Sequence, residues 1–196
     1  MPLIADRYDS STRYKIPLYP KPKLKIGVLG GSFNPAHAGH LYVATQAKKR
    51  LGLDQVWLLV SPGNPLKDQA TMLPLEERVK RAEAFAGSVP FVKAVDVESA
   101  LGMVRTYDTL KALKTVLKDS EFMWLMGADN LATIDRWYRW QELIDFIQVA
   151  VFDRSSMKYK AISGKGYAYG KEQISFFSIK KHPFSATYIR NSWKKV

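Results

Sequence analysis

The 196-residue chain contains no cysteine, which excludes a disulfide framework, thiolate ligation of zinc and a cysteine nucleophile. Long hydrophobic runs are also missing: stretches such as residues 56–60 are far shorter than the roughly 20 residues that cross a bilayer. The first twenty-odd residues lack the apolar stretch of a secretory signal. We therefore expect a cytoplasmic protein that has no membrane partner.

The composition is that of an ordinary globular protein. Hydrophobic residues make up 46% of the chain and charged residues 24%, and the length suits one domain. Residues 1–23 are basic and rich in proline, so we predict a leader outside the core. Residues 24–196 are predicted to form a single domain.

Acidic residues are scarce at the C-terminal end. Residues 154–196 carry ten lysines and arginines against Glu172 alone, a net +9 of the total +12. This asymmetry indicates either a polyanionic partner, a nucleic acid or a phosphorylated small molecule, or a solvated lysine-rich surface. A basic nucleic-acid-binding protein stays open as a rival function, although no nucleic-acid partner is expected. The aromatic residues that favour this rival, interleaved among the lysines, are Tyr159, Tyr167, Tyr169, Phe176 and Phe177.

Short apolar runs alternate with segments of helical periodicity along most of the chain. Strands are predicted at residues 24–29, 55–61, 91–97, 122–126, 148–152 and 174–179. Helices are predicted at residues 39–51, 75–86, 109–117 and 137–146, and from residue 185 onward. This alternation predicts an α/β fold: a Rossmann-like, doubly wound parallel sheet with helices on both faces.

The first predicted strand leads directly into the loop GGSFNPAHAGH, residues 30–40. Ligands of doubly wound sheets bind beyond the carboxyl ends of the strands. His37 and His40 lie three apart at the start of the next helix and so share a face. Their ring donors, the backbone amides near Gly39 and the helix dipole would together form a phosphate site. Ordinary capping histidines, or a zinc site with the distant His182, are the alternatives.

This loop resembles the first motif of the nucleotidyltransferase α/β-phosphodiesterase superfamily, in which [HT]xGH follows the first strand. A second stretch, SATYIR at residues 185–190, resembles the ISSTxIR signature of the same superfamily. Independently of the resemblance, Ser185 and Thr187 can cap a helix and offer hydroxyls to an anion, and Arg190 can clamp phosphate with its fork of donors. Simple helix capping is the alternative interpretation of this stretch.

Within the superfamily, the chain is most similar to the nicotinate-nucleotide adenylyltransferases. His37, rather than threonine, at the first motif position argues against the phosphopantetheine adenylyltransferases. Three further stretches agree with the resemblance, which covers roughly residues 24–193: PGNPLK at 62–67, TYDTL at 106–110, and GADN followed by DRW within 127–137.

The resemblance implies an enzyme of NAD biosynthesis that transfers AMP from ATP to nicotinate mononucleotide and releases pyrophosphate. ATP and nicotinate mononucleotide are then the partners, Mg²⁺ enters as a cofactor with ATP, and the protein itself holds no metal. Another acceptor on the same fold, nicotinamide mononucleotide or phosphopantetheine, stays open, as does a homo-oligomer. A phosphate acceptor is already an anion at neutral pH, so we expect direct in-line attack on the α-phosphorus, without a covalent enzyme intermediate.

The resemblance also implies the roles of individual residues. His37 and His40 would hold the ATP phosphates, Arg190 and Ser185 the departing pyrophosphate, and Asp129 the ribose of adenosine. Trp137 would stack on the pyridine ring, although helix packing with Trp140 is an alternative. The catalytic group is His37, His40 and Arg190; the ATP-binding group is Gly30, Gly31, Ser32, Phe33, Gly39, Gly127, Asp129, Ser185 and Thr187; the acceptor-binding group is Asn64, Lys67, Thr106 and Trp137.

Three positions depart from the family pattern. Asn34 replaces the aspartate of the usual GGTFDP, which removes one carboxylate. Ala186 replaces a serine of ISST, and one hydroxyl near the phosphates is lost with it. Arg105 stands where many members have tyrosine before the threonine, on the acceptor side.

Overall fold

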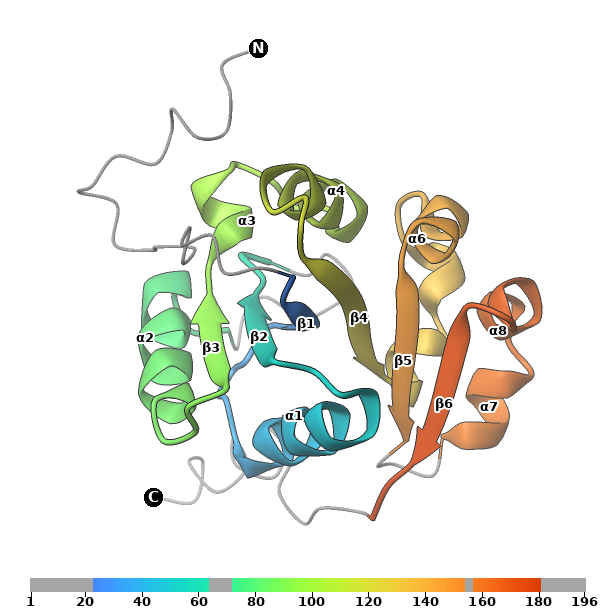
Figure 1. The fold of residues 1–196 in the computed structure, drawn as a ribbon, viewed down its shortest axis with the longest axis horizontal. Coiled ribbons are helices and arrows are strands. Elements are labelled where there is room, and N and C mark those ends of the chain that lie inside the picture. The colour runs from blue at the N-terminus through green and yellow to red at the C-terminus, as the bar shows by residue number, and fades with distance from the viewer. Residues whose placement is uncertain (1–22, 64–71, 154–156, 181–196) are drawn as a thin grey trace.

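The computed structural model describes residues 23–63, 72–153 and 157–180. Within them, six parallel strands form one sheet in the order β3-β2-β1-β4-β5-β6 (Figure 1). The strands are β1 (Lys25–Gly31), β2 (Gln55–Val60), β3 (Val92–Val95), β4 (Glu121–Gly127), β5 (Gln148–Asp153) and β6 (Ile174–Ser178). The chain runs outward from β1 to β3 and then outward from β4 to β6, so its direction switches between β1 and β4. The predicted doubly wound α/β sheet is confirmed.

Helices cover both faces of the sheet (Figure 1). One face carries α1 (Ala38–Leu51) and α2 (Leu75–Ala86). The opposite face carries α3 (Val97–Ala100), α4 (Thr106–Val116), α5 (Ala128–Leu131), the 3₁₀ helix η2 (Ile134–Arg136), α6 (Trp140–Phe146), α7 (Lys158–Ile162) and α8 (Lys165–Gly170). No helix in the described part of the chain is long and apolar enough to cross a membrane.

Alternating side chains of the strands supply two separate hydrophobic cores. In β2, Val56, Leu58 and Val60 pack toward α1 and α2. Trp57 and Leu59, between them, pack toward the opposite face. Successive side chains of a strand point to opposite faces, and both faces here are covered. This is why β2 reads as an uninterrupted apolar run rather than as an alternating one.

The helix predicted at residues 137–146 is shorter than expected. It begins at Trp140, because Arg139 adopts a left-handed backbone with φ of 51° and Trp137 is extended. Helical periodicity does not reveal such a break at non-glycine residues. Trp137 therefore lies outside the helix, and the alternative interpretation, in which it packs with Trp140 on one helix, is wrong.

Two short helices, α7 and α8, lie in a segment where the sequence pattern is weak. α8 packs through Tyr167 and Tyr169 and, at closest range, through its glycines. A Cβ atom at Gly166 would lie 2.1 Å from Ile134, and one at Gly170 would lie 2.5 Å from Ile144. Close packing by glycine produces no apolar periodicity, so the sequence pattern gave no sign of these helices.

Candidate active site

The start of α1 is organised by the two histidines of the first motif. His37 is the N-cap residue, and its Nδ1 accepts a hydrogen bond from the backbone N–H of Gly39 at 3.1 Å. The Nδ1 of His40 accepts from the backbone N–H of His37, also at 3.1 Å. These reciprocal bonds form a capping box, and the two rings stack with centroids 3.8 Å apart. Because both Nδ1 atoms are acceptors, each neutral ring carries its proton on Nε2.

This arrangement corrects one detail of the sequence analysis. The backbone amide of Gly39 donates to His37, so it does not contribute to a phosphate site as expected. The histidines are at once the helix cap and the candidate phosphate ligands, and the capping fixes how both rings are held. Phe33 is buried beside them, 1% exposed, and its ring meets that of His40 edge-on with centroids 4.8 Å apart. Phe33 thus supports the His40 ring from within the core.

A cavity of about 280 Å³ opens at the carboxyl ends of β1 and β2, beside the point where the chain changes direction. Its walls include residues predicted for both substrates. Gly30, Gly31 and Ser32 come from the predicted ATP side. Thr106, the first residue of α4, and Trp137, in the extended link after η2, come from the predicted acceptor side. The structure therefore brings these five predicted residues together around one space, whereas Phe33, His37, Gly39 and His40 are not among its lining residues.

The cavity also has three charged residues, Glu98, Arg105 and Arg136. The sequence analysis placed Arg105 on the acceptor side as a departure from the family pattern but assigned no role to Glu98 or Arg136. Both arginines are exposed, and among the described residues neither pairs with a carboxylate. Glu98 follows the carboxyl end of β3, and Arg136 directly precedes Trp137. Ligands collect beyond strand ends, so the position of Glu98 after a predicted strand was the signal that could have found it.

Aromatic side chains line one end of the cavity. Trp137 is half-buried and meets Trp124 edge-on, with ring centroids 6.3 Å apart. The guanidinium of Arg105 lies 5.5 Å from the ring centroid of Tyr138, which also lines the cavity. A positive charge thus stands next to the aromatic surface. This pairing suits a flat ligand that carries an anionic substituent.

The remaining predicted residues lie elsewhere or outside the described ranges. Gly127 ends β4 and Asp129 follows in α5, and neither lines the cavity. A Cβ atom at Gly127 would lie only 2.2 Å from Oδ1 of Asp129, so that carboxylate folds back over the glycine. The predicted residues outside the described part of the chain are Asn64, Lys67, Ser185, Thr187 and Arg190, together with His182 of the zinc alternative.

Burial shapes the electrostatics of the cavity wall. Glu98 is 3% exposed, and burial raises its pKa from 4.5 to about 7. The hydroxyl of Thr109 donates to its Oε1 at 3.3 Å, which partly opposes that rise. Burial also raises the pKa of the neighbouring Asp96 to about 6. Near neutral pH, Glu98 therefore exchanges between its neutral and charged forms.

Comparison with known proteins agrees with this architecture. Residues 28–192 match the family described as cytidylyltransferase-like. The chain is 46% identical over 140 residues to the probable nicotinate-nucleotide adenylyltransferase of Parvibaculum lavamentivorans, covering 71% of this chain and 69% of that protein. It is 40% identical over 186 residues to the protein of the same name from Gluconobacter oxydans, covering 86% and 95%.

The chain belongs to the nicotinate-nucleotide adenylyltransferase family. This membership confirms the resemblance seen in the sequence motifs. Among solved structures, the nicotinic acid mononucleotide adenylyltransferase of Plasmodium falciparum complexed with NaAD superposes with a TM-score of 0.69 at 18% identity. That likeness covers 86% of this chain and 83% of the other, and at this identity it shows the shared fold.

In this member of the adenylyltransferase family, we expect Glu98→Gln to stabilise the fold increasingly as the pH rises. The unfolded glutamate ionises near 4.5, whereas the folded one keeps its proton up to about 7. The folded state therefore binds more protons between these values, and the free energy of unfolding of the natural protein falls as the pH rises through that window. Glutamine does not ionise, so the advantage of the variant should grow to on the order of 2 kcal/mol.

Denaturant unfolding measured at several pH values between about 4.5 and 8 checks this expectation. Glu172→Gln, which removes an exposed carboxylate, is the control for the loss of one charge. A stability difference between Glu98→Gln and the natural protein that stays constant across this range would contradict it.

Proposed function

We propose that the chain transfers AMP from ATP to nicotinate mononucleotide, forming nicotinate adenine dinucleotide and pyrophosphate in NAD biosynthesis. The observation that carries this proposal is the single cavity that the loop after β1 shares with Thr106 and Trp137. The names of the curated relatives support the same activity. A reaction between two soluble nucleotides also fits the cytoplasmic location expected from the sequence.

Catalysis in this proposal depends on positioning and on neutralising charge. The phosphate of the acceptor attacks the α-phosphorus in line, and pyrophosphate leaves. The stacked imidazoles of His37 and His40 hold phosphate oxygens through their Nε2 donors. Their capping bonds orient them before the substrate arrives, so little reorganisation is needed as charge develops. Mg²⁺ would enter with ATP rather than be held by a predicted residue of this chain, and it would supply positive charge that neutralises the phosphates.

Residues outside the described ranges keep the roles that the family resemblance implies. Arg190 and Ser185 hold the departing pyrophosphate, and Thr187 belongs to the ATP-binding group. Asn64 and Lys67 belong to the acceptor side. Asp129, exposed at the end of β4, meets the ribose of adenosine.

The acceptor side of the cavity suits an anionic pyridine nucleotide. Trp137 offers an indole face to the electron-poor ring. Arg105 and Arg136 add two positive charges, while the partly neutral Glu98 adds less than one negative charge. Nicotinate mononucleotide carries both a phosphate and a ring carboxylate, so it gains more from these guanidinium groups than an acceptor with a neutral amide.

A panel of acceptors tests the proposed reaction. Pyrophosphate release from ATP is measured with nicotinate mononucleotide, nicotinamide mononucleotide and phosphopantetheine in turn. We expect kcat/KM for the nicotinate nucleotide to exceed the other two by about tenfold or more, the worth of one charged hydrogen bond. Preference for another acceptor would reassign the substrate, and no pyrophosphate release with any of them would refute the activity.

Two substitutions separate the capping role of His40 from its catalytic role. Glutamine at this position of a capping box still accepts the backbone N–H of His37, whereas alanine does not. Both His40→Gln and His40→Ala should lower kcat by about 10²-fold, because both remove the imidazole donor. Only His40→Ala should also lose about 1 kcal/mol of folding stability. A nearly normal kcat for the glutamine variant would rule out the catalytic role.

Trp137→Ala should raise KM for the acceptor about tenfold and leave KM for ATP nearly unchanged, since stacking on the ring is lost. Trp140→Ala is the matched control, because this half-buried tryptophan packs against Tyr169, with ring centroids 5.2 Å apart, and does not line the cavity. Steady-state kinetics with each substrate varied in turn checks both variants. An effect of Trp137→Ala confined to ATP would move this residue to the other substrate.

A further inference from the structure

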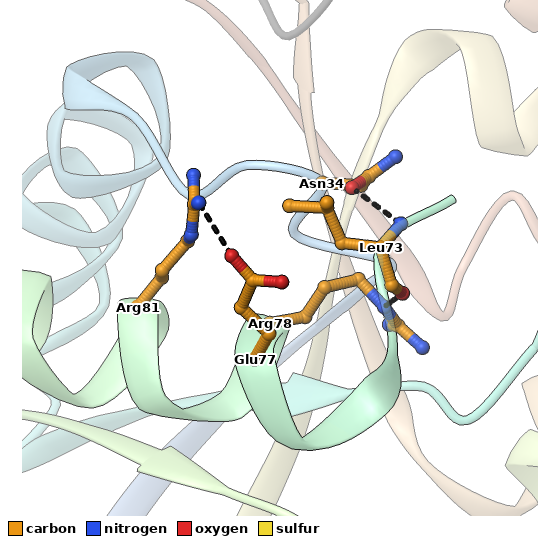
Figure 2. Close-up of polar contacts among 5 residues, drawn as sticks. All are labelled: Asn34, Leu73, Glu77, Arg78 and Arg81. Atoms are coloured by element: carbon orange, nitrogen blue, oxygen red, sulfur yellow. Dashed lines mark hydrogen bonds and ion pairs between the residues drawn. The ribbon is translucent and has the colours of Figure 1, made fainter. Parts of the chain in front are cut away.

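Arg78, on the first turns of α2, is a buried arginine to which the proposed reaction assigns no role. It is 1% exposed, and its guanidinium donates to four backbone carbonyl oxygens. Nε donates to Leu73 at 2.9 Å, and Figure 2 shows this end of the side chain beside the segment that leads into α2. The other three bonds run from Nη1 to Ser32 at 2.8 Å, from Nη1 to Ser61 at 2.7 Å and from Nη2 to Pro62 at 3.0 Å.

The carbonyls of Ser32, Ser61 and Pro62 belong to the two loops that leave the sheet at the cavity, one after β1 and one after β2. The pairing of β1 with β2 ends at Gly31 and Val60, and the N–H of Ser61 still donates to Gly31 at 3.0 Å. One step further, the strands no longer pair, and a single nitrogen of Arg78 binds the carbonyls of both Ser32 and Ser61. The guanidinium therefore continues the link between the segments that follow β1 and β2, beyond the last hydrogen bond between the two strands.

Both linked loops form walls of the cavity. Ser32 and Ser61 line it directly, and so does Gly63, whose carbonyl accepts from the hydroxyl of Ser61 at 2.9 Å. Arg78 is buried behind this wall and binds the backbone carbonyls of Ser32, Ser61 and Pro62. The wall after β1 belongs to the predicted ATP side. The wall after β2 comes from PGNPLK, the stretch that the family resemblance assigns to the acceptor, and its described residues end at Gly63.

A second hydrogen bond, from Leu73 to Asn34, ties the segment before α2 to the loop after β1. The N–H of Leu73 donates to Oδ1 of Asn34 at 3.2 Å, while the carbonyl of Leu73 accepts from Arg78 (Figure 2). Asn34 is the position at which the family pattern has aspartate. Its amide oxygen supplies the hydrogen-bond acceptor that this junction uses, so this bond does not require a carboxylate at position 34.

Arginine is well suited to this position. Its planar fork offers five N–H donors in fixed directions, whereas lysine offers a single compact charge. Burial lowers the pKa of Arg78 from its ordinary value, and the carboxylate of Asp96 opposes that fall. Burying a cation costs several kcal/mol unless its donors are satisfied, and the four carbonyls supply that compensation.

We infer that Arg78 is a positioning residue for the transfer reaction, which fixes the acceptor-side loop after β2 against the ATP-side loop after β1. The inference rests on the proposed function, because it assigns the two loops to two substrates. In-line attack requires the reacting atoms to lie about 3 Å apart, and a displacement of about 1 Å can cost on the order of 10²-fold in rate. The loop after β2 leaves the sheet at Ser61 and is the wall that Arg78 holds at two carbonyls, so its loosening should weaken acceptor binding most.

The test compares Arg78→Lys and Arg78→Met with Arg81→Lys and Arg81→Met. Arg81 lies one turn further along α2, where it is exposed and paired with Glu77 (Figure 2). It is not among the residues that line the cavity. The control pair thus repeats each chemical change on the same helix. KM for each substrate, kcat, and the thermal unfolding midpoint are measured for all four variants and for the natural protein.

We expect Arg78→Lys to raise KM for nicotinate mononucleotide about tenfold and to lower kcat about tenfold, with KM for ATP changed less than about threefold. Arg78→Met should be worse than Arg78→Lys in kcat/KM, and both Arg81 variants should stay within about twofold of the natural protein. A purely structural role would lower the folded fraction and kcat without changing either KM.

The outcomes separate the two proposals. If the natural protein releases no pyrophosphate with any acceptor, the proposed function and this inference both fall. If the natural protein is active and the folded Arg78 variants keep its KM for the acceptor, only the inference falls. If neither Arg78 variant folds at any temperature at which the Arg81 variants do, Arg78 serves folding, and the positioning role is overturned.

Discussion

The candidate site depends on the parallel pairing of β1 with β2 on one side and with β4 on the other. This central position places the loop after β1 at the point where the chain changes direction, with the loop after β2 and the segment after β4 beside it. Close approach is required there: a Cβ atom at Gly30 would lie 2.1 Å from the buried ring of Trp124. The absence of a side chain at Gly30 therefore lets the indole form the floor of the cavity rather than displace the strand.

Hydrogen bonds at the ends of strands and helices hold the loops of the candidate site in place. His37 and His40 satisfy the first amides of α1 with their own rings, and Arg78 satisfies the carbonyls of two loops that have left the sheet. Backbone groups in such places must find partners when water is excluded. In this protein the partners are the candidate catalytic side chains and a buried guanidinium, so the groups that complete the fold also hold the backbone of the candidate site.

Much of the fold and part of the site could be predicted from the sequence. Local patterns and motif resemblance predicted the alternation of strands with helices, the histidine pair of the first loop, and the placing of Thr106 and Trp137 at a ligand site. They did not predict the break before Trp140 or the roles of Glu98, Arg136 and Arg78. A positive φ at Arg139 leaves no mark on apolar periodicity, and an arginine within a helix of charged residues looks like a surface residue until its burial is known.

The sequence by itself determined the class of fold, the family and the loop in which phosphate chemistry is expected, because these depend on residues close together in the chain. Only the tertiary structure decided which distant residues meet: Ser32 with Ser61 through Arg78, and Arg105 with Tyr138 beside Trp137. It also decided the charge of Glu98 near neutral pH, since desolvation depends on what covers a carboxylate. Periodicity and spacing reflect residues that are near one another along the chain. Burial, and contacts between residues far apart in the sequence, arise only when the sheet has formed.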